Sequence, residues 1–234
     1  MADRTVRAHR AHRAHGAVRA DRTVRAERAG ATRELILTAA ERLFAEHGVY
    51  AVSNRQVSEA AGQGNNAAVG YHFGTKADLV RAVARRHAEQ IEEIRVRLLT
   101  ATGDSSDVRD WVDCLVRPIP EHLAALGSPT WYARFCAQVM TDPALHRILI
   151  EESLASASLR QIVGEVNRRL PDLPPEVHTE RAAMARQLIV HMCAERERAL
   201  AEGAPTPRAS WQDTATGLVD AVLGLWLAPV THRA

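Results

Sequence analysis

The sequence predicts an all-α protein, because three of its properties favour helices over strands. Hydrophobic residues make up 46% of the 234 residues and aromatic residues only 4%, so alanine, leucine, valine and isoleucine fill most of the core. Alanine and leucine are strong helix formers. Long stretches lack glycine and proline, and none alternates apolar and polar residues as a half-buried strand does. A chain of this length can bury one large core or two smaller ones.

The first 29 residues read as a basic tail of low complexity. They carry eight arginines against three acidic residues, a net charge of +5, and repeat one heptapeptide at residues 2–8 and 20–26. The tail has too little apolar mass to offset the entropy of ordering, so we expect residues 1–29 to be disordered. Two roles fit it: an arm that adds DNA affinity by counterion release, or a dispensable extension.

The first predicted helix begins with Thr32 as its N-cap and stops at Gly48. Its apolar residues recur with the helical period and should face the core together. They are Leu35, Ile36, Ala39, Ala40, Leu43 and Phe44.

Two shorter helices complete a predicted helix-turn-helix domain over residues 30–79. Ser53 and Gln56 form a capping box that starts the second helix, which ends at Gly62. A polar turn follows, and the third helix is expected over residues 66–72. Short helices joined by a glycine-bearing turn are typical of this motif, whose last helix enters the major groove of DNA.

The remainder, residues 80–234, is predicted to be a second helical domain. Thr75 and Asp78 form another capping box, which opens a long helix. Prolines, which cannot continue a helix, and glycines separate the segments that follow. We expect helices over residues 76–101, 107–126, 129–140, 143–170, 175–202 and 209–227.

The motifs in the first domain resemble those of the tetracycline-repressor (TetR) family. They are TRELIL at 32–37, LFAEHG at 43–48, VSEAAG at 57–62, YHFG at 71–74 and KADL at 76–79. The resemblance implies an all-α dimer with an N-terminal DNA-binding domain and a C-terminal domain for ligand binding and dimerisation. The segment between Gly62 and Phe73 is one residue longer than the family's common spacing, and Gly70 stands where many relatives carry tyrosine.

The resemblance also implies which residues contact DNA. Side chains that donate hydrogen bonds or carry charge are expected on the phosphates: Thr32, Arg33, Ser53, Tyr71, His72 and Lys76. Base edges are expected to be read by Gln63, Asn65, Asn66 and Ala67. Asn65 and Asn66 fit a second interpretation equally, in which they cap the third helix.

Two surfaces are expected in the second domain. Pairing of the last two helices with a second copy would use Leu188, Met192, Leu218, Val222, Leu225 and Trp226, although packing within one chain also explains their apolar character. An effector pocket would draw on the aromatic cluster and its surroundings, namely Trp111, Trp131, Tyr132, Phe135, Cys136, Met140 and His191. Ordinary core packing is the alternative for these residues.

Other classes of protein have little support in the sequence. It contains no HExxH, GxSxG, Walker or CxxC motif, so we predict no enzyme, cofactor or metal site. No apolar run is long enough to span a membrane, and three scattered cysteines fit a reducing cytoplasm. A plain helical interaction module would not need the exposed polar turn. The sequence predicts a cytoplasmic repressor that binds a palindromic operator as a homodimer and is released by a small, largely apolar effector.

Overall fold

A computed structural model describes residues 27–65 and 67–231, and all regular secondary structure in these ranges is helical. One unlabelled helix covers residues 27–47. It is followed by α2 (Asn54–Ala60), α3 (Ala68–Phe73), α4 (Lys76–Thr102), α5 (Val108–Val116), α6 (Pro118–Leu126), α7 (Tyr132–Met140), α8 (Pro143–Leu154), α9 (Ala157–Arg169), α10 (Pro175–Glu202) and α11 (Trp211–Leu227). The all-α fold class is therefore confirmed. The expectations for residues 1–26 and for Asn66 lie outside the described residues.

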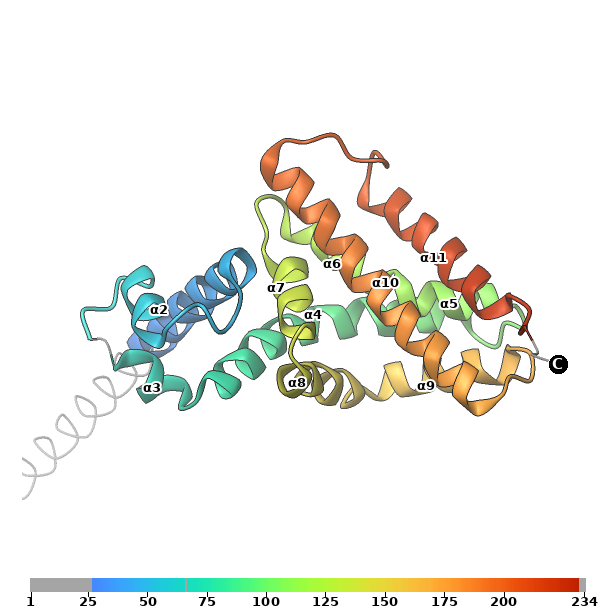
Figure 1. The fold of residues 1–234 in the computed structure, drawn as a ribbon, viewed down its shortest axis with the longest axis horizontal. Helices are drawn as coiled ribbons and strands as arrows, with labels where there is room; N and C mark the ends of the chain where they lie inside the picture. Colours follow the sequence, from blue (N-terminus) through green and yellow to red (C-terminus); the bar gives the residue numbers. More distant parts are fainter. Residues whose placement is uncertain (1–26, 66, 232–234) are drawn as a thin grey trace, which may run out of the picture.

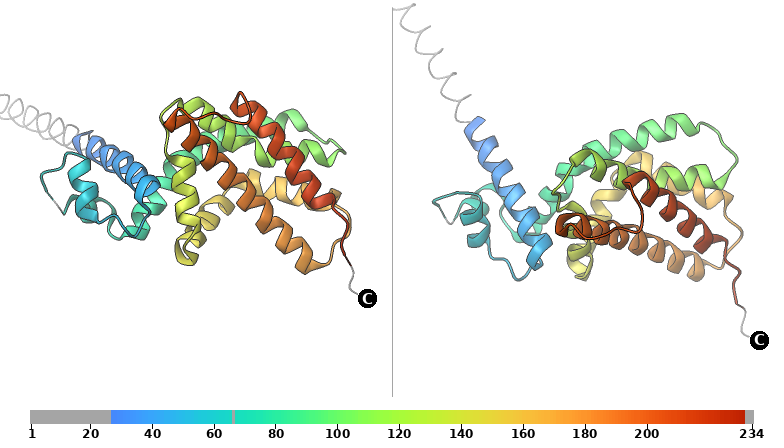
Figure 2. Two further views of the ribbon diagram at one scale, coloured as in Figure 1. Left: turned by 45° about the horizontal axis from the view of Figure 1, so that its top comes forward. Right: turned by 90° about the horizontal axis from the view of Figure 1, so that it is seen from above.

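The helices form two units joined by α4 (Figures 1 and 2). The helix over residues 27–47, α2 and α3 gather at one end, and α4 runs from them into a larger helical body. In that body α4 packs against α5, α6, α8 and α9, while α10 packs against α7 and α11. The two units share a core, because the rings of Phe44 and Phe135 stack with centroids 6.4 Å apart.

The first helix begins earlier than predicted. Residues 27–31 are already helical, so Thr32 lies inside the helix and cannot be its N-cap. Alanine, arginine and glutamate favour the helix here, and a single glycine is tolerated. The predicted core face is correct for Ile36 and Phe44, which are fully buried, but Leu35 is exposed and Leu37 is buried in its place.

The two predicted capping boxes are confirmed. The Ser53 side chain accepts from the backbone N–H of Gln56 at 3.2 Å, and Gln56 Oε1 accepts from the Ser53 N–H at 2.8 Å. Thr75 and Asp78 form the same reciprocal pair at the start of α4. Gly48 ends the first helix with φ +84°, a conformation that residues with a Cβ rarely adopt.

The helix predicted over residues 143–170 is broken into α8 and α9. Ser156 lies between them in an extended conformation, and its side chain accepts from the Leu159 N–H at 3.0 Å as the N-cap of α9. Serine competes with helical hydrogen bonding in this way, and the segment over residues 153–158 contains three serines. The break lies beside a cavity described below.

Candidate DNA interface and effector cavity

The short helix α3 presents its middle to solvent and its flanks to the core. Val69 and Phe73 are buried, whereas the side chain of Tyr71 is 83% exposed. The turn before α3 is held by Asn65, whose Oδ1 accepts from the Ala67 N–H at 2.9 Å. Ala67 itself is exposed at the start of α3. This bond closes the turn before α3, whose N-cap is Ala67 without a side-chain cap, so base contact by Asn65 and Ala67 stays a prediction, as does capping by Asn65.

Several residues expected on phosphates also have partners inside the protein. The Arg33 guanidinium lies 4.4 Å from the centre of the Phe73 ring, and its Nη1 donates to the His72 carbonyl at 3.4 Å. Gln63, expected to read bases, donates from Nε2 to the Ala61 carbonyl at 3.0 Å. Ser53 caps α2. The contacts of Arg33 join α3 to the helix over residues 27–47.

Lys76 holds the loop that precedes α2. Its Nζ donates to the carbonyls of Val49 at 3.0 Å and Val52 at 2.5 Å, and partial burial lowers the pKa of its ammonium group. An ammonium has three N–H bonds. The loop therefore takes two of them, and one remains for the phosphate contact that the family resemblance implies.

Substituting Lys76 with methionine should lower the free energy of unfolding by about 1–3 kcal/mol, because it removes the donors of two partly buried carbonyls. Urea unfolding followed by circular dichroism measures the change. The matched control is Arg55→Gln, which removes an exposed cation paired with Glu59 at 2.8 Å and should change stability by about 0.5 kcal/mol or less. Equal stability of Lys76→Met and the parent would contradict the loop-holding role.

The helix-turn-helix region has no excess of positive charge. Residues 30–79 contain four cations against five anions, Arg33, Arg42, Arg55 and Lys76 against Glu34, Glu41, Glu46, Glu59 and Asp78. DNA affinity from this region must then come from individually placed donors rather than from a general field.

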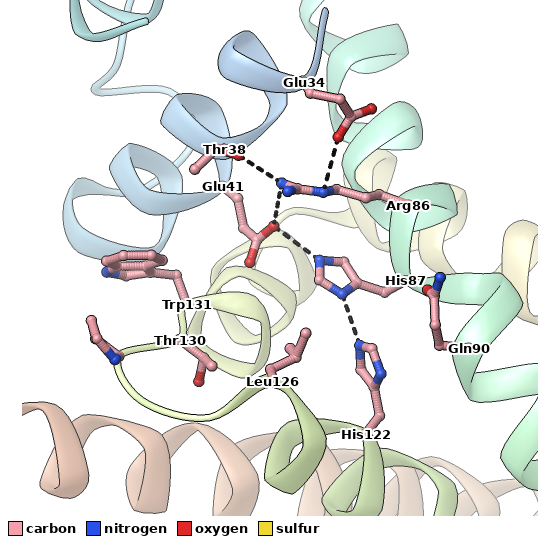
Figure 3. Close-up of a pocket in the computed structure, with 11 residues that line it drawn as sticks. Glu34, Thr38, Glu41, Arg86, His87, Gln90, His122, Leu126, Thr130 and Trp131 are labelled. Carbon is pink, nitrogen blue, oxygen red and sulfur yellow. Dashed lines mark hydrogen bonds and ion pairs between the residues drawn. The ribbon is translucent and has the colours of Figure 1, made fainter. Parts of the chain in front are cut away.

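A polar cluster joins the first unit to the second (Figure 3). Glu41 Oε2 lies 2.9 Å from His87 Nε2, and His87 Nδ1 lies 2.8 Å from His122 Nε2. All three side chains are buried, and the Tyr132 ring stacks on His87 at 3.9 Å. Burial, followed by the proximity of His87, lowers the pKa of His122 from 6.5 to about 4. The cluster borders a polar junction cavity of about 500 Å³, which Trp131 also lines.

Arg86 forms a second set of contacts between the same two units (Figure 3). Its Nη1 donates to Thr38 Oγ1 at 3.0 Å and lies 3.6 Å from Glu41 Oε2, while its Nε lies 3.4 Å from Glu34 Oε2. His87 and Arg86 are neighbours on α4. A movement of α4 at this point would therefore be transmitted directly to the helix over residues 27–47.

A second cavity, of about 450 Å³, lies inside the C-terminal body between α4 and α6–α9. Its lining combines apolar side chains with a polar group, in which Glu92 and Arg95 of α4 meet Ser156 at the break between α8 and α9. The lining residues are Ala84, Ala88, Glu89, Ile91, Glu92, Arg95, Ile119, Tyr132, Leu149, Glu152, Ser153, Ala155, Ser156 and Ala157. We call it the inner cavity.

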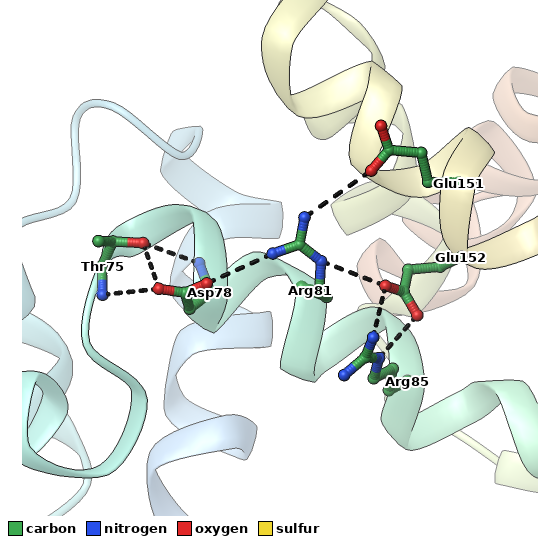
Figure 4. Close-up of polar contacts among 6 residues, drawn as sticks. All are labelled: Thr75, Asp78, Arg81, Arg85, Glu151 and Glu152. Carbon is green, nitrogen blue, oxygen red and sulfur yellow. Dashed lines mark hydrogen bonds and ion pairs between the residues drawn. The ribbon is translucent and has the colours of Figure 1, made fainter.

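An ion-pair chain connects the start of α4 with the wall of the inner cavity (Figure 4). Arg81 lies 3.3 Å from Asp78, which belongs to the capping box of α4, and 3.2 Å from Glu152 on α8. Arg85 reaches the same Glu152 carboxylate at 2.7 Å. Glu152 therefore has two cationic partners, and α8 is fastened to α4 beside the cavity.

The structure separates the residues that were expected to line one effector pocket. Tyr132 lines the inner cavity and Trp131 the junction cavity. Phe135 and Met140 are buried core residues of α7, and Cys136 is partly buried. Two candidates lie elsewhere: Trp111 is buried on α5, where its indole N–H donates to the Ser105 carbonyl at 2.9 Å, and His191 is exposed on α10. None of these five lines either of the two cavities described above.

Sequence reasoning missed the polar side of the inner cavity. Glu92 and Arg95 lie one turn apart on α4 and meet Ser156 from the helix break. The available signal was an arginine one turn beyond Ile91, on the face of α4 that carries the helix's apolar residues. Ser156 could not be placed opposite it without the fold.

The dimer candidates also divide into two groups. Leu218, Val222 and Trp226 are buried in the chain's own core, where α11 packs against α5 and α6, so intramolecular packing is the correct interpretation for them. Leu188 and Leu225 are partly buried, and Met192 remains 44% exposed. The broad apolar surface of α11 is explained by its central position between neighbouring helices.

Two further observations concern residues 27–65 and 67–231 only. Within them, no three histidine, cysteine, aspartate or glutamate side chains gather as metal ligands would. In the same ranges, no helix combines the length and apolar character needed to cross a bilayer.

Comparison with known proteins agrees with this architecture. Residues 36–83 match the family model "Bacterial regulatory proteins, tetR family", and residues 113–224 match "Tetracyclin repressor-like, C-terminal domain". The HTH-type transcriptional repressor AcnR of Corynebacterium glutamicum is 40% identical over 63 residues, which are 27% of this chain and 33% of the repressor. The chain thus matches only about a third of that relative's length.

Solved structures show the same fold at low sequence identity. A TetR family transcription regulator from Marinobacter aquaeolei VT8 superposes with a TM-score of 0.58 and 15% identity, covering 85% of this chain and 97% of that one. A TetR-family regulator from Rhodococcus sp. gives 0.52 and 17%, covering 84% and 99%. The two family models together cover more than half of the sequence, and the chain belongs to the TetR family of bacterial regulatory proteins.

Proposed function

We propose that this regulator is a repressor that binds operator DNA through α3, two copies at a time, and is released by a small molecule. The observation that carries the DNA-binding part is the placement of α3. It is braced by α2 and α4, and Tyr71 projects from it almost fully exposed. A braced helix with a free donor side chain is the arrangement that phosphate and base contacts require.

Tyr71 provides the direct test. Tyr71→Ala should weaken operator binding about tenfold, the effect of losing one phosphate contact, because each 1.4 kcal/mol is tenfold in affinity. Stability should change by about 0.5 kcal/mol or less, as expected for an exposed side chain. Fluorescence anisotropy with DNA from the promoter beside the protein's own gene, at low and moderate salt, measures the affinity.

Leu154 offers a control, since it is 48% exposed but lies at the end of α8 and not on α3. Leu154→Ala should bind as the parent does. Parent-like binding by Tyr71→Ala would remove α3 from the interface. Failure of the parent to bind that DNA at either salt concentration would count against the repressor function itself.

Dimerisation is supported by exposed apolar side chains on the last two helices. Met184, Met192 and Leu200 of α10 and Leu227 of α11 are each between 38% and 48% exposed. Two copies are also what a palindromic site with two half-sites requires. The face proposed here differs from the one expected from sequence, since it uses the exposed residues and leaves Leu218 and Val222 in the core.

Met192→Arg should shift the protein toward monomer and weaken binding to the full palindrome at least tenfold, because it places a charge within an apolar contact. Sedimentation velocity measures the oligomeric state. Val96→Arg is the control, as Val96 is similarly exposed, at 47%, but lies on α4. A dimer that survives Met192→Arg unchanged would exclude this part of α10 from the interface.

Release would depend on coupling between the inner cavity and the first unit. Tyr132 lines the cavity and stacks on His87, and His87 contacts Glu41 of the helix over residues 27–47. A ligand that displaces Tyr132 would shift the balance between two arrangements of the DNA-binding unit, and affinity for operator and ligand would then be linked reciprocally.

A further inference from the structure

Arg95 is a buried cation with unused donors at the inner cavity. Arg95 is only 8% exposed to solvent. Nη1 donates to Glu92 Oε2 at 2.7 Å and to Ser156 Oγ at 3.3 Å. Nε is completely buried, and neither Nε nor Nη2 has a hydrogen-bond partner among residues 27–65 and 67–231. Leaving a buried donor unsatisfied destabilises the protein, so this edge of the guanidinium suits an acceptor that the protein does not supply.

The remaining charges around the cavity are balanced. Burial raises the pKa of Glu92, but hydrogen bonds from Ser156 and Ser158 and the pairing with Arg95 bring it below its ordinary value, so Glu92 is ionised. Glu152 is neutralised by two arginines of α4, as described above. Glu89 lies exposed at the rim, where solvent screens its charge. Among the described residues that line the cavity, Arg95 is thus the one with a buried donor that lacks a partner.

The rest of the lining is largely apolar. It includes Ala84, Ile91, Ile119, Tyr132 and Leu149, from α4, α6, α7 and α8. The volume of about 450 Å³ is within the range of sites for small organic molecules. A molecule that fits must bury a hydrocarbon or aromatic body against these walls and bring one acceptor group to Arg95.

We propose that the inner cavity binds a small organic carboxylate with an apolar body, and that the carboxylate pairs with the Nε–Nη2 edge of Arg95 after the side chains that cover Nε move aside. A guanidinium presents two parallel N–H bonds along that edge, and a carboxylate accepts both. The inference rests on the proposed function, since it assigns the chemistry of the effector. It also gives the ligand a means of action, because Arg95 contacts Ser156, the N-cap of α9, and the cavity wall includes Tyr132.

The test uses the full chain and three probes with the same eight-carbon body: octanoate, octanol and octylamine. Isothermal calorimetry at millimolar concentrations measures binding, and anisotropy measures release of operator DNA. Octanoate should bind at least tenfold more tightly than either of the others, because only it forms the charge-assisted pair. Tighter or equal binding of octanol or octylamine, or no binding of octanoate, overturns the proposal.

Variants locate the site. Arg95→Lys keeps the charge but loses the two-pronged edge, and should weaken octanoate about tenfold. Arg95→Met should weaken it further. Arg97→Met is the control, because Arg97 is an exposed arginine of the same helix that pairs with Glu121 outside the cavity. Parent-like affinity in both Arg95 variants overturns the assignment.

A blocking variant keeps the test decisive if the Arg95 variants fold poorly. Ala88 lies at the exposed rim of the cavity, so Ala88→Trp should fill the entrance without disturbing the core, and octanoate binding should be lost. Parent-like binding in that variant overturns the site.

The two proposals can fail separately: a parent that binds operator but not octanoate defeats the ligand inference alone. A parent that binds octanoate but no operator defeats the proposed function.

Discussion

Replacing Glu197 with alanine is expected to lower the free energy of unfolding by about 3–5 kcal/mol, the cost of breaking a buried charge pair by removing one partner. Glu197 is 2% exposed on α10 and caps the start of α7 from outside. Its carboxylate accepts from the N–H groups of Ala133 at 3.2 Å and Arg134 at 2.9 Å, from Thr130 Oγ1 at 2.7 Å and from Arg134 Nε at 3.2 Å. The residue before α7 supplies no side-chain cap, so the substitution leaves all these donors unpaired.

Chemical denaturation measures the effect, and a neighbouring glutamate provides the control. Glu195 lies two residues away on α10 and forms an exposed ion pair with Arg198 at 2.7 Å, so Glu195→Ala should cost about 0.5 kcal/mol or less. Glu197→Gln keeps the shape but not the charge and should fall between the two. A loss below about 1 kcal/mol in Glu197→Ala would show that water or a rearranged α7 replaces the cap.

The second large effect is a loss of folding stability in acid that depends on the protonation of His122. The pKa of His122 is lowered in the folded chain to about 4, from an ordinary 6.5, so between these values the unfolded chain binds more protons. The contribution of His122 is therefore complete above pH 6.5 and is lost as the pH falls toward 4. The full shift would correspond to about 3 kcal/mol, and water in the junction cavity reduces our expectation to about 2 kcal/mol.

The geometry explains the direction. Protonation would place a positive charge on a buried ring beside His87 and the Tyr132 ring, and the carboxylate of Glu41 contacts His87 rather than His122. Unfolding free energies measured at pH 7 and pH 4.5 should differ less in His122→Gln than in the parent, by roughly the amount above. His47→Gln serves as the control, because the His47 side chain is 59% exposed. An identical pH dependence in the parent and His122→Gln would contradict the role of His122.

The sequence predicted best what depends on neighbouring residues. The capping boxes at Ser53 and Thr75 join residues three apart, so they are legible without the fold. The bounds of α10 follow from the prolines and the glycine that flank it, whereas α11 begins two residues later than predicted, at Trp211, because Ser210 is its N-cap. Leu35 was wrongly predicted to face the core. The first helix starts before Thr32, and packing against α4 and α7, rather than the cap, determines which face of that helix is buried.

What the sequence could not predict depends on distant pairs. Glu197 is 67 residues from Thr130, and Arg95 is 61 residues from Ser156, so neither polar cluster leaves a local pattern. A broad apolar surface on a helix also does not show whether it packs against a second copy or against a neighbouring helix of the same chain. For this reason Leu218 and Val222 were assigned to the wrong partner. The aromatic residues expected in one effector pocket lie in different places for the same reason, since a buried side chain need not line a cavity.

The role of Lys76 in the loop has a practical consequence, because it is the single lysine of the chain. Among side chains, an amine-selective reagent can therefore modify only this ammonium, which is held by two loop carbonyls. The rate of acylation at Lys76 would measure how often the loop over residues 48–53 opens, in the way that hydrogen exchange reports local unfolding. Labelling in the presence and absence of operator DNA or a carboxylate probe would follow the state of the DNA-binding unit without any engineered label.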